Sequence, residues 1–254
     1  MSGLPTFSTA SSPSAPLSRQ EVHVWFCDLV LHEGDRSALA SLLSIDERAR
    51  AARFAFERDR HRFITSHGLL RTILARYVGG AASRIEFSAG THGKPALSGH
   101  SCAAQDIQFS LSHSGTYALV AVAAGRAVGV DVEVCRPGVD ALQLAERFFA
   151  AGESQQIAQA PGDAQSRLFY RYWTAKEAYL KGRGVGLSLG LDRFEILFDG
   201  RSPRAQVRVA DSGALDTNWQ VQSLSLGDHV SGALAVEGDA WQTRTFASGQ
   251  SLLR

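Results

Sequence analysis

The chain has 254 residues, of which 44% are hydrophobic and 20% charged, the usual balance of a globular protein. Its 26 Lys and Arg residues against 25 Asp and Glu residues leave a net charge of +1, which excludes a generally basic nucleic-acid coat and a strongly acidic solvating protein. No run approaches the roughly 18 apolar residues that a membrane span needs. The three cysteines are widely spaced and form no C-x-x-C, so we predict reduced thiols in a cytoplasmic protein without a nucleic-acid or membrane partner.

The two ends of the chain differ in composition from the middle. The first 18 residues are rich in Ser, Pro and Ala and contain no Lys or Arg, which predicts a disordered tail over 1–19 rather than a secretory signal. The polar stretch 238–254 predicts a loose C-terminal tail. Between the tails we predict an N-terminal lobe over 20–128 and a C-terminal lobe over 129–237.

The first lobe is expected to begin with a strand at 22–26. Ser44-Ile45-Asp46-Glu47 fits a capping box and predicts a helix start, and the segment that follows, 47–62, is dense in arginine. Residues 63, 70, 74 and 77 then form one apolar helical face, which Gly79-Gly80 is expected to end. Alternation at 107–112 and apolar residues at 117–124 predict strands.

The second lobe is expected to begin with a strand at 128–134, where valines alternate with other residues. Gly125-Arg126 just before it predicts a hairpin with the strand at 117–124. Helices are expected at 141–149 and 163–181, followed by strands near 194–198, 205–209, 219–224 and 230–236. Each half offers helices and antiparallel strands, so we predict an α+β fold of two similar lobes.

Two carboxylates lie close together in the expected strand at 128–134. Asp131 and Glu133 share one face of that strand and lie roughly 6.5–7 Å apart at Cα, a spacing at which both can reach one hard cation such as Mg²⁺. A half-exposed strand with acids toward solvent is the alternative.

The helix at 163–181 carries a third acid and a lysine. Trp173, Glu177 and Lys181 share one of its faces, so Glu177 is a further candidate metal ligand and Lys181 a candidate phosphate contact. The alternative is that Glu177 and Lys181 form a surface ion pair and that Trp173 belongs to the core.

Three further segments offer groups for phosphate binding. Ser112 and His113 cannot form a nucleophile–base pair in an extended strand, because neighbours face opposite ways, but they can hold phosphate oxygens or form a polar turn. Lys94 lies in a Gly-Lys-Pro turn. The arginines of 47–62 suit polyphosphate recognition or a solvated face.

Taken in order, these segments resemble the 4′-phosphopantetheinyl transferase superfamily, in particular its longer Sfp-type branch. The resemblance covers about residues 20–236, and its most specific motifs are Gly-Val-Asp-Val-Glu at 129–133 and Trp-Thr-Ala-Lys-Glu-Ala-Tyr-Leu-Lys at 173–181. It implies an α+β monomer of two lobes related by a pseudo-twofold axis. It also implies transfer of 4′-phosphopantetheine from coenzyme A to a serine of an apo acyl or peptidyl carrier protein.

The resemblance also implies roles for individual residues. Asp131, Glu133 and Glu177 match the family's ligands for Mg²⁺, which Mn²⁺ can replace, and Lys181 matches its pyrophosphate contact. Coenzyme A contacts are implied for Arg50, Arg53, Arg62, Lys94, Ser112, His113 and Lys181. Glu47 departs from the pattern, since a basic residue is expected there in the best-known relatives.

The implied reaction is direct attack of the carrier serine on the β-phosphate of coenzyme A, with 3′,5′-ADP leaving. Lys181 supplies fixed positive charge, and Glu177 is the candidate base for the serine proton, directly or through a bound water. Two alternatives remain open at this stage. One is a non-catalytic coenzyme A or nucleotide-binding protein on the same fold, and the other is an Mg²⁺-dependent diphosphate hydrolase.

Overall fold

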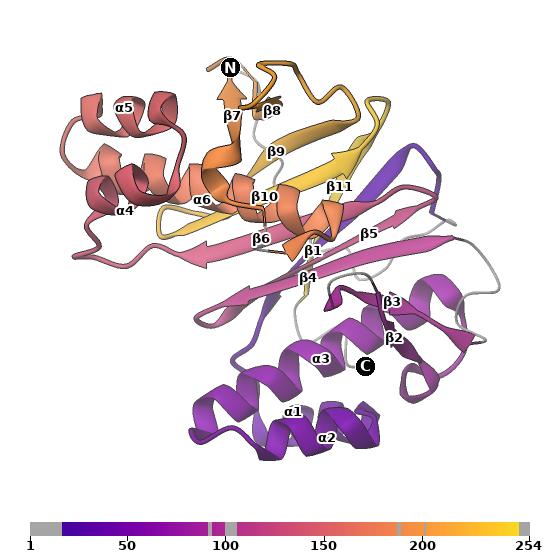
Figure 1. Cartoon of the computed structure of the whole chain (residues 1–254). Coiled ribbons are helices and arrows are strands. Elements are labelled where there is room, and N and C mark those ends of the chain that lie inside the picture. The colour runs from indigo at the N-terminus through magenta and orange to yellow at the C-terminus, as the bar shows by residue number, and fades with distance from the viewer. Residues whose placement is uncertain (1–16, 91–92, 100–105, 187–188, 201, 249–254) are drawn as a thin grey trace.

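A computed structural model of the chain describes residues 17–90, 93–99, 106–186, 189–200 and 202–248. They form an α+β structure of two lobes, each built on a mostly antiparallel sheet (Figure 1). The fold class predicted from the sequence is therefore confirmed. No helix among the described residues is both long and apolar enough to cross a bilayer.

The N-terminal lobe packs helices on a four-stranded sheet of order β11-β1-β5-β4. Its strands are β1 (Glu21–Asp28), β4 (Ile107–Ser114), β5 (Tyr117–Ala124) and β11 (Gln242–Ser248), and its helices are α1 (Glu33–Leu42), α2 (Ile45–Ala52) and α3 (Glu57–Val78). A short helical turn (Ala82–Arg84) and a two-stranded sheet of β2 (Phe87–Ala89) and β3 (Pro95–Leu97) follow α3. Phe63, Leu70 and Leu74 of the predicted apolar face of α3 are buried, and Tyr77 is partly buried.

The helix boundaries follow the local signals. Ser44 and Glu47 form the predicted capping box, since Ser44 Oγ accepts from the Glu47 N–H and the Glu47 carboxylate accepts from the Ser44 N–H. The α3 helix ends at Gly79, as predicted. Helix α1 approaches α3 at Gly68, where an added Cβ would lie 2.6 Å from Leu39 Cβ.

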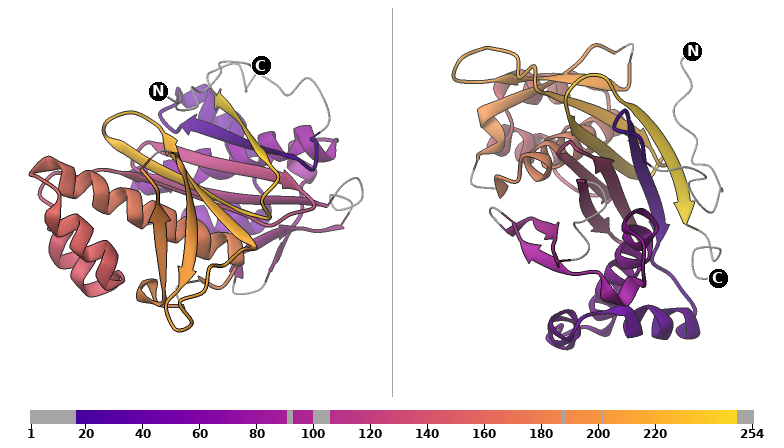
Figure 2. Two further views of the ribbon diagram at one scale, coloured as in Figure 1. Left: turned by 90° about the horizontal axis from the view of Figure 1, so that it is seen from above. Right: turned by 90° about the vertical axis from the view of Figure 1, so that its right-hand side faces the viewer.

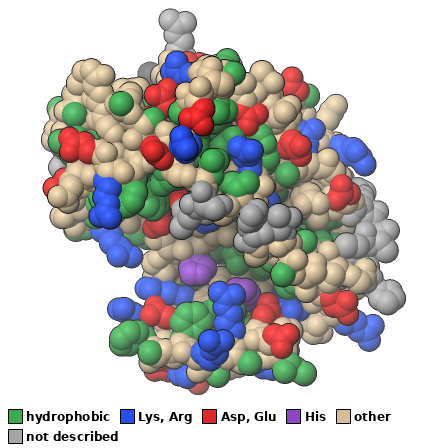
Figure 3. All heavy atoms as spheres, viewed as in Figure 1, with side chains coloured by type: hydrophobic (Ala, Val, Ile, Leu, Met, Phe, Trp, Pro, Cys, Tyr) green, Lys and Arg blue, Asp and Glu red, His purple; other side chains and the backbone are tan. Residues whose placement is uncertain are grey.

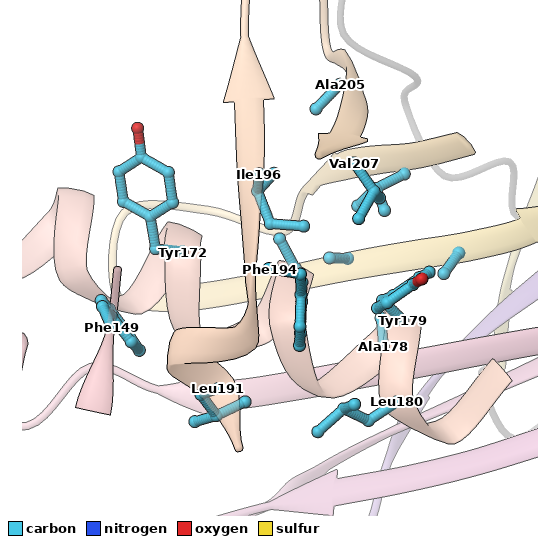
Figure 4. Close-up of a cluster of buried hydrophobic side chains, with 14 of the residues drawn as sticks. Phe149, Tyr172, Ala178, Tyr179, Leu180, Leu191, Phe194, Ile196, Ala205 and Val207 are labelled. Carbon is cyan, nitrogen blue, oxygen red and sulfur yellow. The ribbon is translucent and has the colours of Figure 1, made fainter. Parts of the chain in front are cut away.

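The C-terminal lobe is a five-stranded sheet of order β6-β10-β9-β8-β7, with α6 across it. Its strands are β6 (Val128–Val134), β7 (Phe194–Phe198), β8 (Arg204–Val209), β9 (Trp219–Ser225) and β10 (Val230–Glu237). Its helices are α4 (Ala141–Phe148), α5 (Ala151–Gln159) and α6 (Asp163–Arg183), and a short turn (Leu191–Arg193) leads into β7. Tyr172 and Tyr179 of α6 enter a core shared with Phe194 and Ile196 of β7 (Figure 4).

The predicted hairpin of residues 117–124 and 128–134 is wrong. Strand β5 is paired on both sides, with β1 and with β4, and so has no free edge for β6. Strand β6 instead pairs with β10 in the other sheet. Gly125 and Arg126 therefore lead the chain from one sheet to the other.

The prediction of a loose C-terminal tail is also wrong over 242–248. These residues form β11, which runs parallel to β1 along the edge of the N-terminal sheet (Figure 2). Phe246 is buried and stacks on Trp25, with 4.6 Å between ring centroids. Leu17, which falls in the predicted N-terminal tail, is buried in the same core, because a leucine gains free energy by leaving water. The rest of the two predicted tails, residues 1–16 and 249–254, lies outside the described residues.

Candidate active site

The two sheets meet along β4 and β6, and serine side chains join the two strands. Ser110 Oγ accepts from the Val130 N–H at 3.1 Å, and Ser114 Oγ accepts from the Val134 N–H at 3.2 Å. Ser112 Oγ donates to Asp131 Oδ1 at 2.7 Å. All three serines are buried. Because alternate residues of a strand share a face, the Ser-Leu-Ser-His-Ser run turns three hydroxyls toward β6.

Asp131 is the most buried acid of the site. Its side chain is 3% exposed, and its Oδ1 also accepts from Lys181 Nζ at 2.6 Å. Its Oδ2 is buried and has no hydrogen-bond partner among the described residues. Burial raises the pKa of Asp131, and the charge and hydrogen bond of Lys181 oppose that rise. Lys181 thus pairs with Asp131, whereas the surface ion pair considered from the sequence would have joined it to Glu177.

The other two acids lie close enough to Asp131 to change each other's protonation. Burial raises the pKa of Glu177, and the negative charges of Asp131 and Glu133 raise it further. Burial also raises the pKa of Glu133, whose carboxylate accepts from Ser114 Oγ at 2.6 Å. The structure therefore brings the three predicted acids into one electrostatic neighbourhood.

The oxygen ligands of Asp131, Glu133 and Glu177 are chemically suited to a divalent cation, but the three side chains are not arranged around one. Among the described residues, no group of three or more His, Cys, Asp and Glu side chains is arranged to hold a metal ion. The unpartnered Oδ2 of Asp131 is nevertheless a buried oxygen without a donor, and a cation would satisfy it.

Helix α6 reaches the acids because β6 approaches it very closely. A Cβ added at Gly129 would lie 2.0 Å from Ala178 O and 2.2 Å from Gly182 N, so only glycine fits there. The helix passes through Gly182, ends at Arg183 and is capped by Gly184 in the left-handed conformation. Its last turns thereby carry Glu177 and Lys181 beside β6.

Lys94 joins the lobes instead of facing open solvent. Its Nζ donates to Val128 O at 2.9 Å and to Gly182 O at 3.1 Å, so one ammonium group bridges the start of β6 and the end of α6. Burial lowers the pKa of Lys94 to about 8. If Lys94 also contacts a phosphate, as the resemblance implies, its ammonium group must donate an N–H that is not used by these two carbonyls.

A cavity of about 370 Å³ opens between the lobes, and Lys181, which binds Asp131, is part of its lining. Its lining includes Arg50 of α2, His67 of α3, Lys94 and Lys181 among apolar residues such as Phe109 and Leu180. Figure 3 shows histidine side chains, with Lys and Arg side chains around them, in the hollow between the lower helices and the upper lobe. Apolar walls with several cations suit an organic phosphate.

The remaining predicted contacts, His113, Arg62 and Arg53, do not line this cavity. His113 is on the opposite face of β4 from Ser112, as the strand geometry predicted, and it is exposed. Neighbouring protein atoms nevertheless desolvate the ring in part, which lowers its pKa most, and the positive charges of Lys181, Arg62 and Arg50 lower it further. Arg62 donates to Asp59 Oδ1 at 3.4 Å on the surface of α3. Arg53 follows α2 and lines a separate surface hollow with Arg50.

Sequence reasoning missed two kinds of residue. Ser110 and Ser114 could have been found, since they repeat the strand period of Ser112. The buried pair of Lys176 Nζ and Glu153 Oε2, 2.7 Å apart, could not, because it joins different helices. Lys176 also donates to Leu191 O at 2.7 Å and to Phe194 O at 2.5 Å. It therefore organises the core of the C-terminal lobe instead of the site.

Two family models match adjoining parts of the chain. The model of the 4′-phosphopantetheinyl transferase superfamily matches residues 127–235, and the model of the N-terminal part of 4′-phosphopantetheinyl transferases matches residues 32–125. The chain is 38% identical to the 4′-phosphopantetheinyl transferase HetI of Nostoc sp., over 91% of this chain and 94% of the relative. It is 36% identical to a putative 4′-phosphopantetheinyl transferase of Synechocystis sp., over 80% and 79% of the two chains. It is 31% identical to the 4′-phosphopantetheinyl transferase Sfp of Bacillus subtilis, over 67% and 73%.

Proposed function

This chain belongs to the 4′-phosphopantetheinyl transferase superfamily, in its Sfp-type branch, and we propose that it moves 4′-phosphopantetheine from coenzyme A to a carrier-protein serine with the help of Mg²⁺. The product side would be a holo acyl or peptidyl carrier protein and 3′,5′-ADP. The observation that carries the proposal is the position of Lys181, which lines the cavity and also binds Asp131 of the acid cluster.

The cavity supplies binding for a polyphosphate. Arg50 and Lys181 line it from two lobes, and His113 lies within their electrostatic reach. These groups would hold the phosphates of coenzyme A, and Lys181 would add fixed positive charge where the bond breaks. Lys181 belongs both to the cavity and to the acid cluster, so it is suited to meet the pyrophosphate at their boundary.

The acids supply a cation site and a base. Asp131, with its unpartnered Oδ2, would hold Mg²⁺ together with Glu133 and Glu177, and Mg²⁺ would neutralise charge that builds on the pyrophosphate. Glu177 would accept the proton of the attacking serine. Without a metal ion, burial and the two neighbouring acids raise its pKa.

The test is to incubate the full chain with coenzyme A, MgCl₂ and a panel of apo carrier proteins, and to read the carriers by intact mass. We expect one carrier class to gain a single phosphopantetheine group, with 3′,5′-ADP released in equal amount. Asp211→Asn is a matched control, since Asp211 is an exposed acid that pairs with Arg193 far from β6. Binding without product would favour the non-catalytic alternative, and phosphopantetheine released without a carrier would favour a hydrolase.

A further inference from the structure

Glu47 faces inward at the edge of the cavity, where its charge is fully engaged. Its Oε2 accepts from the Ser44 N–H at 2.9 Å and from Arg71 Nε at 2.7 Å. Its Oε1 lies 3.0 Å from His67 Nδ1. Burial would raise the pKa of Glu47, but the hydrogen bonds of His67 and Ser44 and the charge of Arg71 lower it to about 2. The carboxylate is therefore ionised and held by Ser44, His67 and Arg71.

His67 is fixed between this carboxylate and an aromatic ring. Because an ionised carboxylate only accepts hydrogen bonds, Nδ1 of His67 must carry the proton that faces Glu47. The imidazole stacks on Phe63 with 4.0 Å between ring centroids, and its side chain is 20% exposed. His67 also lines the cavity, so Nε2 is the ring atom left for a ligand.

The charged and titratable groups around His67 come from several elements. Glu47 contacts the ring directly, and His113 of β4 is a second imidazole nearby. The cations near it are Arg50 of α2, Arg62 and Arg71 of α3, Lys94, and Lys181 of α6, of which Arg62 pairs with Asp59 and Lys181 with Asp131. A bound phosphate would therefore meet mostly positive charge on this side of the cavity.

We propose that His67, oriented by Glu47, is a further phosphate-binding residue for coenzyme A and donates its Nε2–H to a phosphate oxygen when the ligand enters the cavity. This inference rests on the proposed function, because it takes coenzyme A as the ligand. It also gives the acid at position 47 a role. Glu47 positions the imidazole and supports its positive charge, so the pair presents a cation to the cavity.

Two substitutions of His67 separate its two nitrogens. In His67→Asn the amide nitrogen can take the place of Nδ1 and keep the bond to Glu47, while the group that reaches the cavity is lost. In His67→Gln the amide reaches toward the position of Nε2 but carries no charge. His61→Asn is the matched control, because His61 lies on the same helix and pairs with the exposed Glu57 at 3.3 Å.

The measurement is calorimetric titration of coenzyme A into each variant, in two buffers that differ in ionisation enthalpy and therefore report proton uptake. We expect wild-type protein to take up protons on binding. We expect His67→Asn to bind about tenfold more weakly or worse and to take up fewer protons, as loss of a charge-assisted contact implies. His67→Gln should lie between, and His61→Asn should behave like wild type.

The outcomes distinguish this inference from the proposed function. Failure of wild-type protein to bind coenzyme A would overturn the proposed function. Wild-type binding with unchanged affinity and proton uptake in both His67 variants would overturn only the role of His67. An equal loss in His61→Asn would also overturn it, since the effect would then belong to α3 in general. Thermal unfolding of each variant checks the fold, and a poorly folded His67→Asn leaves His67→Gln to decide.

Discussion

Replacing Lys181 with methionine tests how the buried charge of Asp131 is balanced. The substitution keeps most of the stem of the side chain and removes the ammonium that lies 2.6 Å from Asp131 Oδ1. Asp131 would then keep Ser112 as its side-chain donor, while Oδ2 stays without a partner. The metal-free protein should therefore lose stability because an acid is left buried without its counter-charge.

The size of the effect follows from burial. Removing one partner of a fully buried ion pair costs about 3–5 kcal/mol. Lys181 is 34% exposed, so solvent already screens part of the attraction and we expect a loss of about 2 kcal/mol. For a chain of this length that corresponds to a fall in Tm of roughly 4–8 °C. Since the pKa of Asp131 is already raised, the variant should recover stability as the pH falls and the acid binds a proton.

Magnesium should reverse this loss. A ligand at a hundredfold excess over its Kd stabilises a protein by about 2.7 kcal/mol. In wild-type protein a cation must compete with Lys181 for Asp131, whereas in Lys181→Met it does not. The rise in Tm between EDTA and saturating MgCl₂ should thus be larger in the variant. The double variant Lys181→Met, Asp131→Asn should regain stability in EDTA and show no such rise. A smaller magnesium effect in Lys181→Met than in wild type would refute the reasoning.

Four other variants test three separate parts of the structure. Asp131→Asn and Glu177→Gln should stay folded and lose about 10²–10³ of the transfer rate, since charge stabilisation of this kind is worth about 3–4 kcal/mol; normal turnover in both would remove the basis of the cation site. Glu47→Gln should flatten acid unfolding: the pKa falls from 4.5 to about 2 on folding, so up to about 3 kcal/mol of stability is present above pH 4.5 and is lost as the pH drops toward 2. If urea titrations show that stability falls with pH in Glu47→Gln as steeply as in wild type, this expectation is wrong. Phe246→Ala should cost about 3 kcal/mol in chemical unfolding, against almost nothing for the exposed Gln242→Ala, and equal effects would mean that β11 contributes no core.

Local patterns predicted the parts of the fold that depend on neighbours in sequence. The capping box at Ser44 and the glycine end of α3 both rest on contacts within one or two helical turns. The strand at 128–134 was predicted for the same reason. Its valines are buried as expected, and Asp131 is buried too, because the serines of β4 lie against the polar face that was expected to meet solvent or a cation.

Pairing partners could not be predicted from those patterns. The polar sequence of β11 gives no sign that it will lie parallel to β1, more than 200 residues earlier in the chain. The contacts of Lys94 with two carbonyls likewise depend on how the two lobes meet. The sequence shows that His67 follows Phe63 by one helical turn. The hydrogen bond of His67 with Glu47, however, depends on how α2 packs against α3.

The site itself belongs to neither lobe alone. Its acids stand on β6 and α6 of the C-terminal lobe, while the serines that hold two of them stand on β4 of the N-terminal lobe. Two further features join the lobes. Lys94 of the N-terminal lobe donates to the end of α6, and β11, which follows the C-terminal sheet in the chain, pairs with β1 of the N-terminal sheet. Separating the lobes would leave Asp131 without Ser112 and the N-terminal sheet without an edge strand. The arrangement of acids, lysine and cavity therefore depends on the whole chain from β1 to β11.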